Sequence, residues 1–160
     1  MIREIKHNEI DFLKEMLYLA LYVPEGQPPF PKSILAHPDV SKYIDNWGTL
    51  PNDIALVAEI NNELIGAIWG RTFSKSNAGF GFIDENTPEL CMAVKEKFRN
   101  QGIGAKLIDE ISKIYFLKGF KSISLSVDKQ NRARLLYLRK GFIVVKEDKD
   151  QDFIMKKILK

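Results

Sequence analysis

The sequence of 160 residues has very few of the side chains that cross-link a chain or bind metals. It contains one cysteine, Cys91, and two histidines, His7 and His37. A single cysteine excludes an intrachain disulfide, which fits a reducing compartment. The same scarcity excludes a zinc site built from soft ligands, so we expect no metal. The fold must therefore depend on a hydrophobic core, which a chain of this length is long enough to bury.

Long apolar runs are also missing. No stretch of about 18 apolar residues occurs, so the sequence predicts no membrane span. The first residues include the charged Arg3, Glu4 and Lys6, which is unlike a signal peptide. We therefore expect a soluble cytoplasmic protein that forms a single domain over residues 1–160.

The charge balance has little excess of either sign, with a formal net charge of +3. That value is too small to predict nucleic-acid binding. The charges are unevenly placed, however. Residues 1–80 carry 7 basic and 10 acidic side chains, whereas residues 81–160 carry 17 basic and 11 acidic ones. An anionic ligand is therefore expected to bind the second half.

Periodic patterns predict a mixed α/β sandwich in one domain, with the element order β-α-α-β-β-β-α-β-α-β-β. The predicted strands cover residues 2–6, 54–60, 64–73, 89–98, 123–127, 142–145 and 152–158. The predicted helices run from Asn8 to about Tyr22, over a short stretch after Pro38, and over residues 104–118 and 131–140. Asn61 and Asn62 predict a hairpin turn, because asparagine tolerates positive φ. Four of the seven prolines fall within residues 24–31 and predict a stiff loop.

The segment from Val94 to Leu107 is the most informative part of the sequence. A strand ends there, a basic glycine-containing turn follows, and an amphipathic helix begins. Free N–H groups and the helix dipole make such a helix N-terminus suited to a phosphate. The spacing R-x-x-G-x-G, from Arg99 to Gly104, fits neither the dinucleotide-binding fingerprint nor the nucleotide-hydrolase P-loop. Taken alone, it is equally compatible with a turn that binds nothing.

A second segment follows the next predicted strand, from Asn131 to Phe142. Together the two segments resemble the GNAT superfamily of acyl-CoA-dependent N-acyltransferases, whose element order also resembles the one predicted here. The residues that match the family patterns are Val94, Arg99, Gly102, Gly104, Asn131, Tyr137, Gly141 and Phe142. The sequence departs from those patterns at Glu96, where proline is common, and at Arg134, where alanine is common.

The resemblance implies acetyl-CoA as the co-substrate. It implies that main-chain N–H groups of the turn bind the pyrophosphate, with assistance from Arg99. The turn residues concerned are Asn100, Gln101, Gly102, Ile103, Gly104 and Ala105. The backbone of Ala93 and Val94 would pair with the pantetheine arm as an added strand would, and the Val94 N–H would polarise the thioester carbonyl. The strand at residues 123–127 is expected to separate from its neighbour to admit that arm.

Two further residues enter through the same resemblance. Asn131 would bind the pantetheine or position the following helix. Arg134 adds a cation that could face the phosphates of the cofactor.

Tyr137 is the candidate general acid, because a phenol with a pKa near 10 is protonated at neutral pH and can donate to a departing thiolate. Its position among leucines is also compatible with a core aromatic. Glu89 is the candidate general base for the attacking amine, and strand alternation places it on the face opposite Val94. Asp84 and Glu85 are alternatives, and each of the three carboxylates is also compatible with a solvated loop charge.

These observations favour an N-acetyltransferase that uses direct transfer in a ternary complex. A catalytically silent acyl-CoA-binding module and an interaction domain with an unliganded loop are the alternatives. The expected partner is a small-molecule or peptide amine, and a homodimer is possible because many relatives dimerise. The side chains that could line the acceptor pocket, or instead form core, are Tyr22, Phe30, Trp47, Trp69 and those of residues 73–82.

Overall fold

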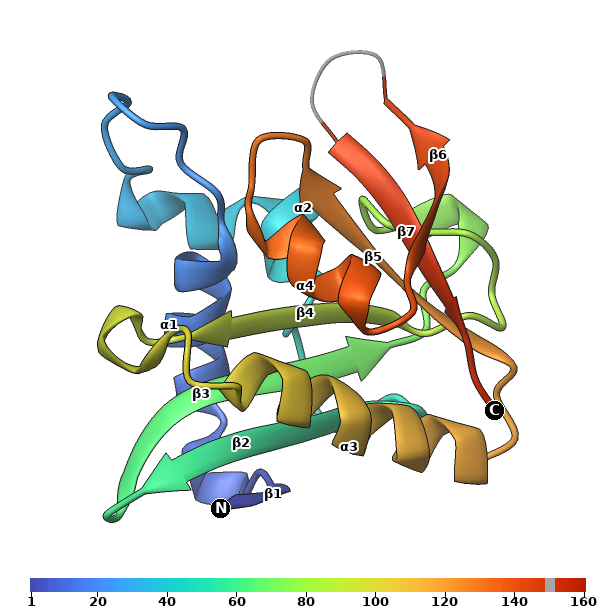
Figure 1. Cartoon of the computed structure of the whole chain (residues 1–160), viewed down its shortest axis with the longest axis horizontal. Coiled ribbons are helices and arrows are strands. Elements are labelled where there is room, and N and C mark those ends of the chain that lie inside the picture. The colour runs from blue at the N-terminus through green and yellow to red at the C-terminus, as the bar shows by residue number, and fades with distance from the viewer. Residues whose placement is uncertain (149–151) are drawn as a thin grey trace.

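The computed structural model describes residues 1–148 and 152–160, which form one mixed sheet covered by helices (Figure 1). The sheet order over these residues is β1-β2-β3-β4-β5-β7-β6. Its strands are β1 (Ile2–Glu4), β2 (Ile54–Ile60), β3 (Glu63–Arg71), β4 (Glu89–Val94), β5 (Ser122–Asp128), β6 (Ile143–Glu147) and β7 (Asp152–Ile158). The α-helices are α1 (Asp11–Ala20), α2 (Pro38–Ser41), α3 (Ile103–Leu117) and α4 (Ala133–Arg139). The predicted fold class and element order are confirmed.

Helices cover both faces of the sheet, and strand alternation divides the apolar side chains between two cores. Along β3, Ile68 packs into the core beneath α3 and α4, whereas Ala67 and Trp69 pack into the core beneath α1 and α2. Figure 1 shows α3 and α4 in front of the sheet and α1 behind it. Every strand of the sheet centre is therefore buried on both sides.

The first four strands form an antiparallel meander. β2 and β3 are joined by Asn61 and Asn62, whose φ angles are 50° and 65°. These left-handed values are those of a tight hairpin turn that matches the twist of the strands. The predicted hairpin is confirmed.

β4 and β5 are parallel neighbours that stay together only briefly. Their ladder consists of one register pair, Glu89 with Ser124, beyond which the strands diverge. The loop before β4 lies against β5 at this point, because the Ser124 Oγ donates to the Gly81 carbonyl at 2.8 Å. A Cβ on Gly81 would come within 2.6 Å of the Leu125 carbonyl carbon, so only glycine fits this approach. The expected separation of these strands is confirmed.

The predicted boundaries were wrong at several ends. The helix predicted from Asn8 is a 3₁₀ turn, η1 (His7–Glu9), followed by α1 from Asp11. The Glu9 carboxylate accepts the Lys6 N–H at 2.8 Å and two N–H groups of Arg3, and these contacts hold the turn apart from the helix. Similarly, the strand predicted to reach Phe98 ends at Val94 and continues as a 3₁₀ turn, η4 (Glu96–Phe98).

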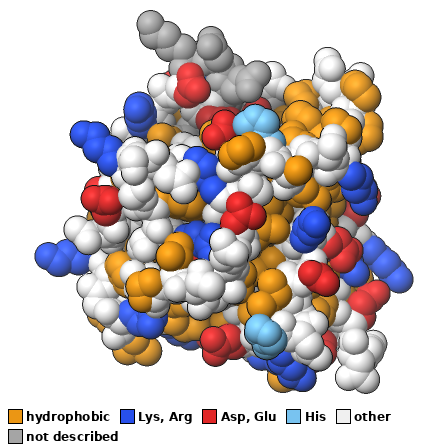
Figure 2. All heavy atoms as spheres, turned by 180° about the vertical axis from the view of Figure 1, so that it is seen from behind, with side chains coloured by type: hydrophobic (Ala, Val, Ile, Leu, Met, Phe, Trp, Pro, Cys, Tyr) orange, Lys and Arg blue, Asp and Glu red, His pale blue; other side chains and the backbone are white. Residues whose placement is uncertain are grey.

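Further short turns complete the description, η2 (Lys32–Ala36) and η3 (Lys75–Asn77). Figure 2 shows the side of the molecule opposite to Figure 1, where charged side chains of both signs are scattered among hydrophobic ones. Both histidines are exposed. No helix among the described residues is long and apolar enough to cross a bilayer.

Candidate active site

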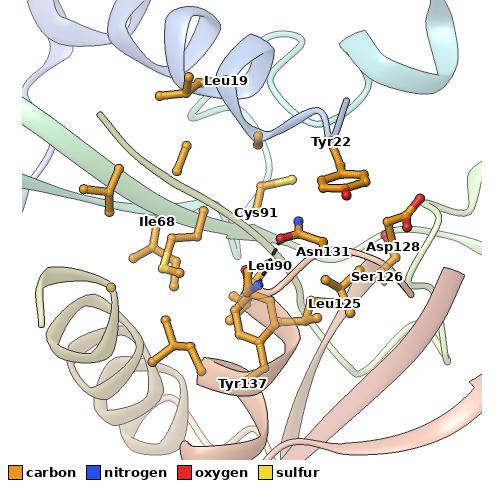
Figure 3. A pocket seen from close by; sticks show the side chains of 18 of the residues that line it. Leu19, Tyr22, Ile68, Leu90, Cys91, Leu125, Ser126, Asp128, Asn131 and Tyr137 are labelled. Atoms are coloured by element: carbon orange, nitrogen blue, oxygen red, sulfur yellow. Dashed lines mark hydrogen bonds between the residues drawn. The ribbon is translucent and has the colours of Figure 1, made fainter. Parts of the chain in front are cut away.

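A cleft of about 1070 Å³ opens where β4 and β5 diverge (Figure 3). It is lined by the end of α1 and the residues after it, by β4, by the start of α3, by β5 and by α4. The divergence matters because it lets side chains from both faces of the sheet reach one space. The volume is that of a site for a small-molecule ligand.

The N-terminus of α3 supplies one end of the cleft with main-chain donors. Gly102 precedes the helix with a φ of 81°, and Asn100 has a φ of 60°. The first N–H groups of a helix lack partners within it, and Ile103, Gly104 and Ala105 all line the cleft. Because these donors lie at the positive end of the helix dipole, they fit a pyrophosphate.

The two glycines of this turn have different tasks. A Cβ on Gly102 would meet nothing within 4 Å, so its role is the left-handed backbone conformation. A Cβ on Gly104 would come within 3.0 Å of Leu136 Cδ2 and 3.2 Å of Met92 Cε. Gly104 therefore lets α3 pack closely against β4 and α4, which brings the donors to the cleft.

Most of the residues predicted to bind the cofactor line this cleft. They are Ala93, Val94, Arg99, Asn100, Gly102, Ile103, Gly104, Ala105 and Asn131. Arg99 also orders the turn, because its Nε donates to the Val94 carbonyl at 2.9 Å. Asn131 Oδ1 accepts the Ala133 N–H at 2.9 Å, the bond drawn in Figure 3, and so holds the start of α4.

Two of the predicted residues lie outside the lining among the described residues. The Gln101 Nε2 donates to the Lys97 carbonyl at 3.5 Å, and the Arg134 Nε donates to the Lys129 carbonyl at 3.2 Å. The arginines of α4 and the residue before it that do line the cleft are Arg132 and Arg139. The sequence patterns did not single these out as ligands.

Glu89 lies at the opposite end of this arrangement, on the α1 side of the sheet, and is 2% exposed. Its Oε2 accepts a hydrogen bond from the Tyr43 hydroxyl, while its Oε1 has no hydrogen-bond partner among the described residues. Burial raises the pKa of Glu89 to about 7, although the Tyr43 hydrogen bond, the nearby Gly81 N–H and the Lys42 ammonium group oppose that rise. A carboxylate with this pKa is suited to accept a proton near neutral pH.

The other carboxylates considered as the base lie elsewhere. Asp84 accepts the Asn86 N–H at 2.8 Å and the Thr87 hydroxyl at 2.9 Å, so it organises the loop before β4. Neither Asp84 nor Glu85 is among the described residues that line the cleft.

Tyr137 reaches the cleft from α4, on the other face of the sheet. Its ring packs edge-on against Phe142 with centroids 5.7 Å apart. Burial and the neighbouring Cys91 thiol raise the pKa of Tyr137, so the phenol is protonated at neutral pH. Burial and Glu89 raise the pKa of Cys91 in turn. Cys91 therefore lies between the candidate base and the candidate acid, and Figure 3 shows Cys91 and Tyr137 beside the same space.

The aromatic residues left open by the sequence divide into two groups. Tyr22, Phe30 and Phe80 line the cleft, and the Tyr22 hydroxyl donates to the Gln130 carbonyl at 3.4 Å across its mouth. Trp69 is buried in the core, and the Arg71 guanidinium lies 5.0 Å from the Trp47 ring.

Sequence reasoning missed Tyr43 altogether and interpreted Cys91 only as strand packing. The period of two along β4 places Cys91 on the same face as Glu89 and could have indicated its position. No comparable signal connects Tyr43 with Glu89, since 46 residues separate them in the sequence.

Comparison with known proteins agrees with this geometry. The family model described as acetyltransferase (GNAT) family matches residues 17–142, whereas a comparison with curated protein sequences gives no significant match. Similar solved structures include the PaiA N-acetyltransferase from Thermoplasma acidophilum in complex with coenzyme A, with 23% identity over 99% of this chain and 98% of that one and a TM-score of 0.70.

An aminoglycoside 6′-N-acetyltransferase complexed with coenzyme A is 19% identical over 100% of this chain and 97% of that one, with a TM-score of 0.69. A GNAT-family acetyltransferase from Streptococcus pneumoniae is 15% identical over 100% and 99%, with a TM-score of 0.70. These likenesses show the same fold, and the family model covers most of the sequence. The chain belongs to the GNAT family of acetyltransferases.

Proposed function

We propose that this protein is an acetyl-CoA-dependent N-acetyltransferase that transfers an acetyl group directly to a primary amine bound in the same cleft. The observation that carries the proposal is the buried Glu89 carboxylate, whose pKa is raised to about 7 beside an unpaired oxygen. A module that only bound the cofactor would need no such group. We further propose that residues 1–160 act as one acetyltransferase domain and that the acceptor is a small molecule or a peptide.

The cofactor would lie along the gap between β4 and β5. The N–H groups of Ile103, Gly104 and Ala105 would hold its pyrophosphate, and Arg132 and Arg139 add positive charge to the lining. The main chain of Ala93 and Val94 borders the gap where the strands have separated and would pair with an extended arm. When bound, acetyl-CoA supplies an acetyl thioester that an amine can attack.

The two candidate catalytic groups handle protons at opposite sides of the gap. A primary amine is mostly protonated at neutral pH and must lose a proton to react, and Glu89 Oε1 is placed to accept it directly or through water. The Tyr137 hydroxyl holds the proton that the departing sulfur needs. Transfer in a ternary complex follows, because both ends of the reaction open into one cleft.

Binding of acetyl-CoA is expected to raise the melting temperature. A ligand at one hundred times its Kd stabilises the folded state by about 2.7 kcal/mol, which corresponds to roughly 5–10 °C for a domain of this size. Differential scanning fluorimetry with acetyl-CoA measures the shift. No shift at millimolar acetyl-CoA would contradict the proposed cofactor.

The same titration has a matched pair of variants. Gly102 and Gly119 flank the two ends of α3, both have positive φ, and a Cβ on either would meet nothing within 4 Å. Gly102→Glu places a carboxylate where the pyrophosphate would bind and should abolish the shift. Gly119→Glu introduces the same backbone strain outside the cleft and should preserve it.

Tyr137→Phe is expected to lower kcat about a hundredfold, at the lower end of the usual contribution of a general acid. The effect is modest because a thiol with a pKa near 8.5 is already a fair leaving group. Steady-state rates with any amine that the wild-type protein acetylates provide the measurement, and the acetyl-CoA thermal shift should remain intact. An unchanged kcat would remove Tyr137 from the mechanism.

A further inference from the structure

Tyr43 is a buried phenol that the sequence patterns did not connect with the chemistry. It follows α2 and is 5% exposed. Its ring packs edge-on against Phe73 with centroids 5.2 Å apart and is stacked on Phe80 at 6.4 Å. Both faces of the ring environment are thus filled, so the hydroxyl has little freedom to move away from Glu89.

The main chain that carries Tyr43 is fixed as firmly as the ring. The Trp69 Nε1 donates to the Tyr43 carbonyl at 3.2 Å, and the Arg71 Nη1 donates to the Lys42 carbonyl at 2.9 Å. The Lys42 ammonium group donates to the Ala78 carbonyl at 2.7 Å. These contacts connect the end of α2 with β3 and with the loop before β4, so the position of the hydroxyl depends on the tertiary fold.

The hydroxyl itself makes two hydrogen bonds of opposite sense. It accepts the Phe80 N–H at 2.7 Å and donates to Glu89 Oε2. Because the N–H of Phe80 occupies the acceptor side of the oxygen, the phenolic proton is directed at the carboxylate. Burial and the adjacent Glu89 raise the pKa of Tyr43, so the phenol keeps that proton.

The loop before β4 closes over this pair. A Cβ on Gly79 would overlap Glu89 Oε1 and would come within 2.6 Å of the Tyr43 hydroxyl. Only a residue without a side chain fits there unless the pair shifts. The loop therefore covers the carboxylate, and Tyr43 fixes one of its two oxygens.

We propose that Tyr43 is a positioning residue, which holds Oε2 of Glu89 and leaves Oε1 as the oxygen that receives the proton of the attacking amine. The inference rests on the proposed role of Glu89 as the base. Tyr43 acts through Glu89 alone, because its hydroxyl is already engaged by Glu89 and Phe80.

Other groups around Glu89 keep their own partners and surroundings. Arg71 pairs with Glu89 in register but binds Asp53 at 2.8 Å, and Ser124 Oγ donates to Gly81. The titratable or charged groups that face Glu89 from the packed elements are Lys42, Tyr43, Arg71 and Cys91. Of these, Tyr43 is the one that donates a hydrogen bond to the carboxylate among the described residues.

The test measures the Glu89 carboxyl directly and needs no acceptor. The ¹³Cδ resonance of Glu89, assigned with Glu89→Gln, is titrated in wild-type protein and in Tyr43→Phe. Loss of the hydroxyl removes a bond that favours the charged form, so the midpoint should rise by about one pH unit. The matched control is Tyr115→Phe, which removes another buried hydroxyl, the one that donates to Asn52 O at 2.9 Å, and should leave the midpoint unchanged.

An unchanged Glu89 midpoint in folded Tyr43→Phe would overturn the inference. If that variant does not fold, the ¹³Cζ resonance of Tyr43 in wild-type protein decides. It should follow the Glu89 midpoint near 7 and lose that step in Glu89→Gln; a flat resonance between pH 5 and 9 would equally refute the inference. With an amine in hand, the acid limb of kcat/KM should move upward by the same amount while the acetyl-CoA thermal shift stays. Failure to acetylate any amine would instead count against the proposed function.

Discussion

Replacing Glu89 with Gln is expected to lower kcat/KM by about 10³-fold at pH 8, within the usual contribution of general base catalysis. The amide cannot accept a proton from the amine, and its volume is nearly that of the carboxyl, so the cleft keeps its shape. Steady-state kinetics with detection of free CoA provide the measurement. Glu85→Gln is the matched control, because Glu85 lies nearby in the sequence and outside the cleft lining.

The pH profile identifies the role of Glu89 more sharply than the rate alone. Because burial raises the pKa of Glu89 to about 7, wild-type kcat/KM should rise with pH through that value. In Glu89→Gln this limb should disappear from the residual activity. Retention of both the rate and the limb would mean that another group, or bulk water, accepts the proton.

The same substitution has a consequence for folding. Since the folded-state pKa of Glu89 is raised, the protonated group contributes stability that is fully present below pH 4.5 and lost as pH rises through about 7. The loss amounts to roughly 3 kcal/mol across that window. Glu89→Gln does not titrate, so urea denaturation should show its stability relative to wild type increasing by that amount between pH 4.5 and 8.

Asp53→Ala is expected to lower the free energy of unfolding by about 3–5 kcal/mol, the cost of leaving a buried charge without its partner. The Arg71 guanidinium forms two hydrogen bonds to the Asp53 carboxylate, at 2.8 and 2.9 Å. Their side chains are 5% and 0% exposed. Asp53 also accepts the Gly48 and Leu50 N–H groups at 3.0 and 3.3 Å, so its removal leaves several donors unpaired.

Urea denaturation at neutral pH measures this loss. Glu110→Ala provides the control, because the ion pair of Glu110 with Lys113 is exposed and should contribute less than about 1 kcal/mol. The double variant Asp53→Ala with Arg71→Met should recover part of the stability, since it removes the unpaired charge. An equal and small effect of Asp53→Ala and Glu110→Ala would show that the buried pair is not essential to the fold.

The fold was predictable where local pattern and tertiary packing agree. β2 and β7 have the bounds that their sequences predict, because both lie in stretches of strand-forming residues bordered by polar ones. The start of α1 was not predictable, since the turn before it depends on the contact of Arg3 with Glu9 and Glu59. That contact joins segments 56 residues apart.

The candidate site divides in the same way. The turn before α3 is encoded within a few consecutive residues, so its glycines and Arg99 could be interpreted from the sequence. The environment of Glu89 requires α2, β3 and the loop at Gly79 to be packed around it. Its burial and its contact with Tyr43 therefore emerge only from the tertiary structure.

The single register pair between β4 and β5 also bears on the cooperativity of folding. It divides the sheet into a meander of four strands, β1 to β4, and a smaller unit of β5, β7 and β6. Between the two, α3 packs on β2, β3, β4 and β5, so a helix couples them where main-chain hydrogen bonds do not. Such units open and close with their own free energies. A ligand lying along the gap would contact both, and part of its binding free energy would tie the two units into one cooperative structure.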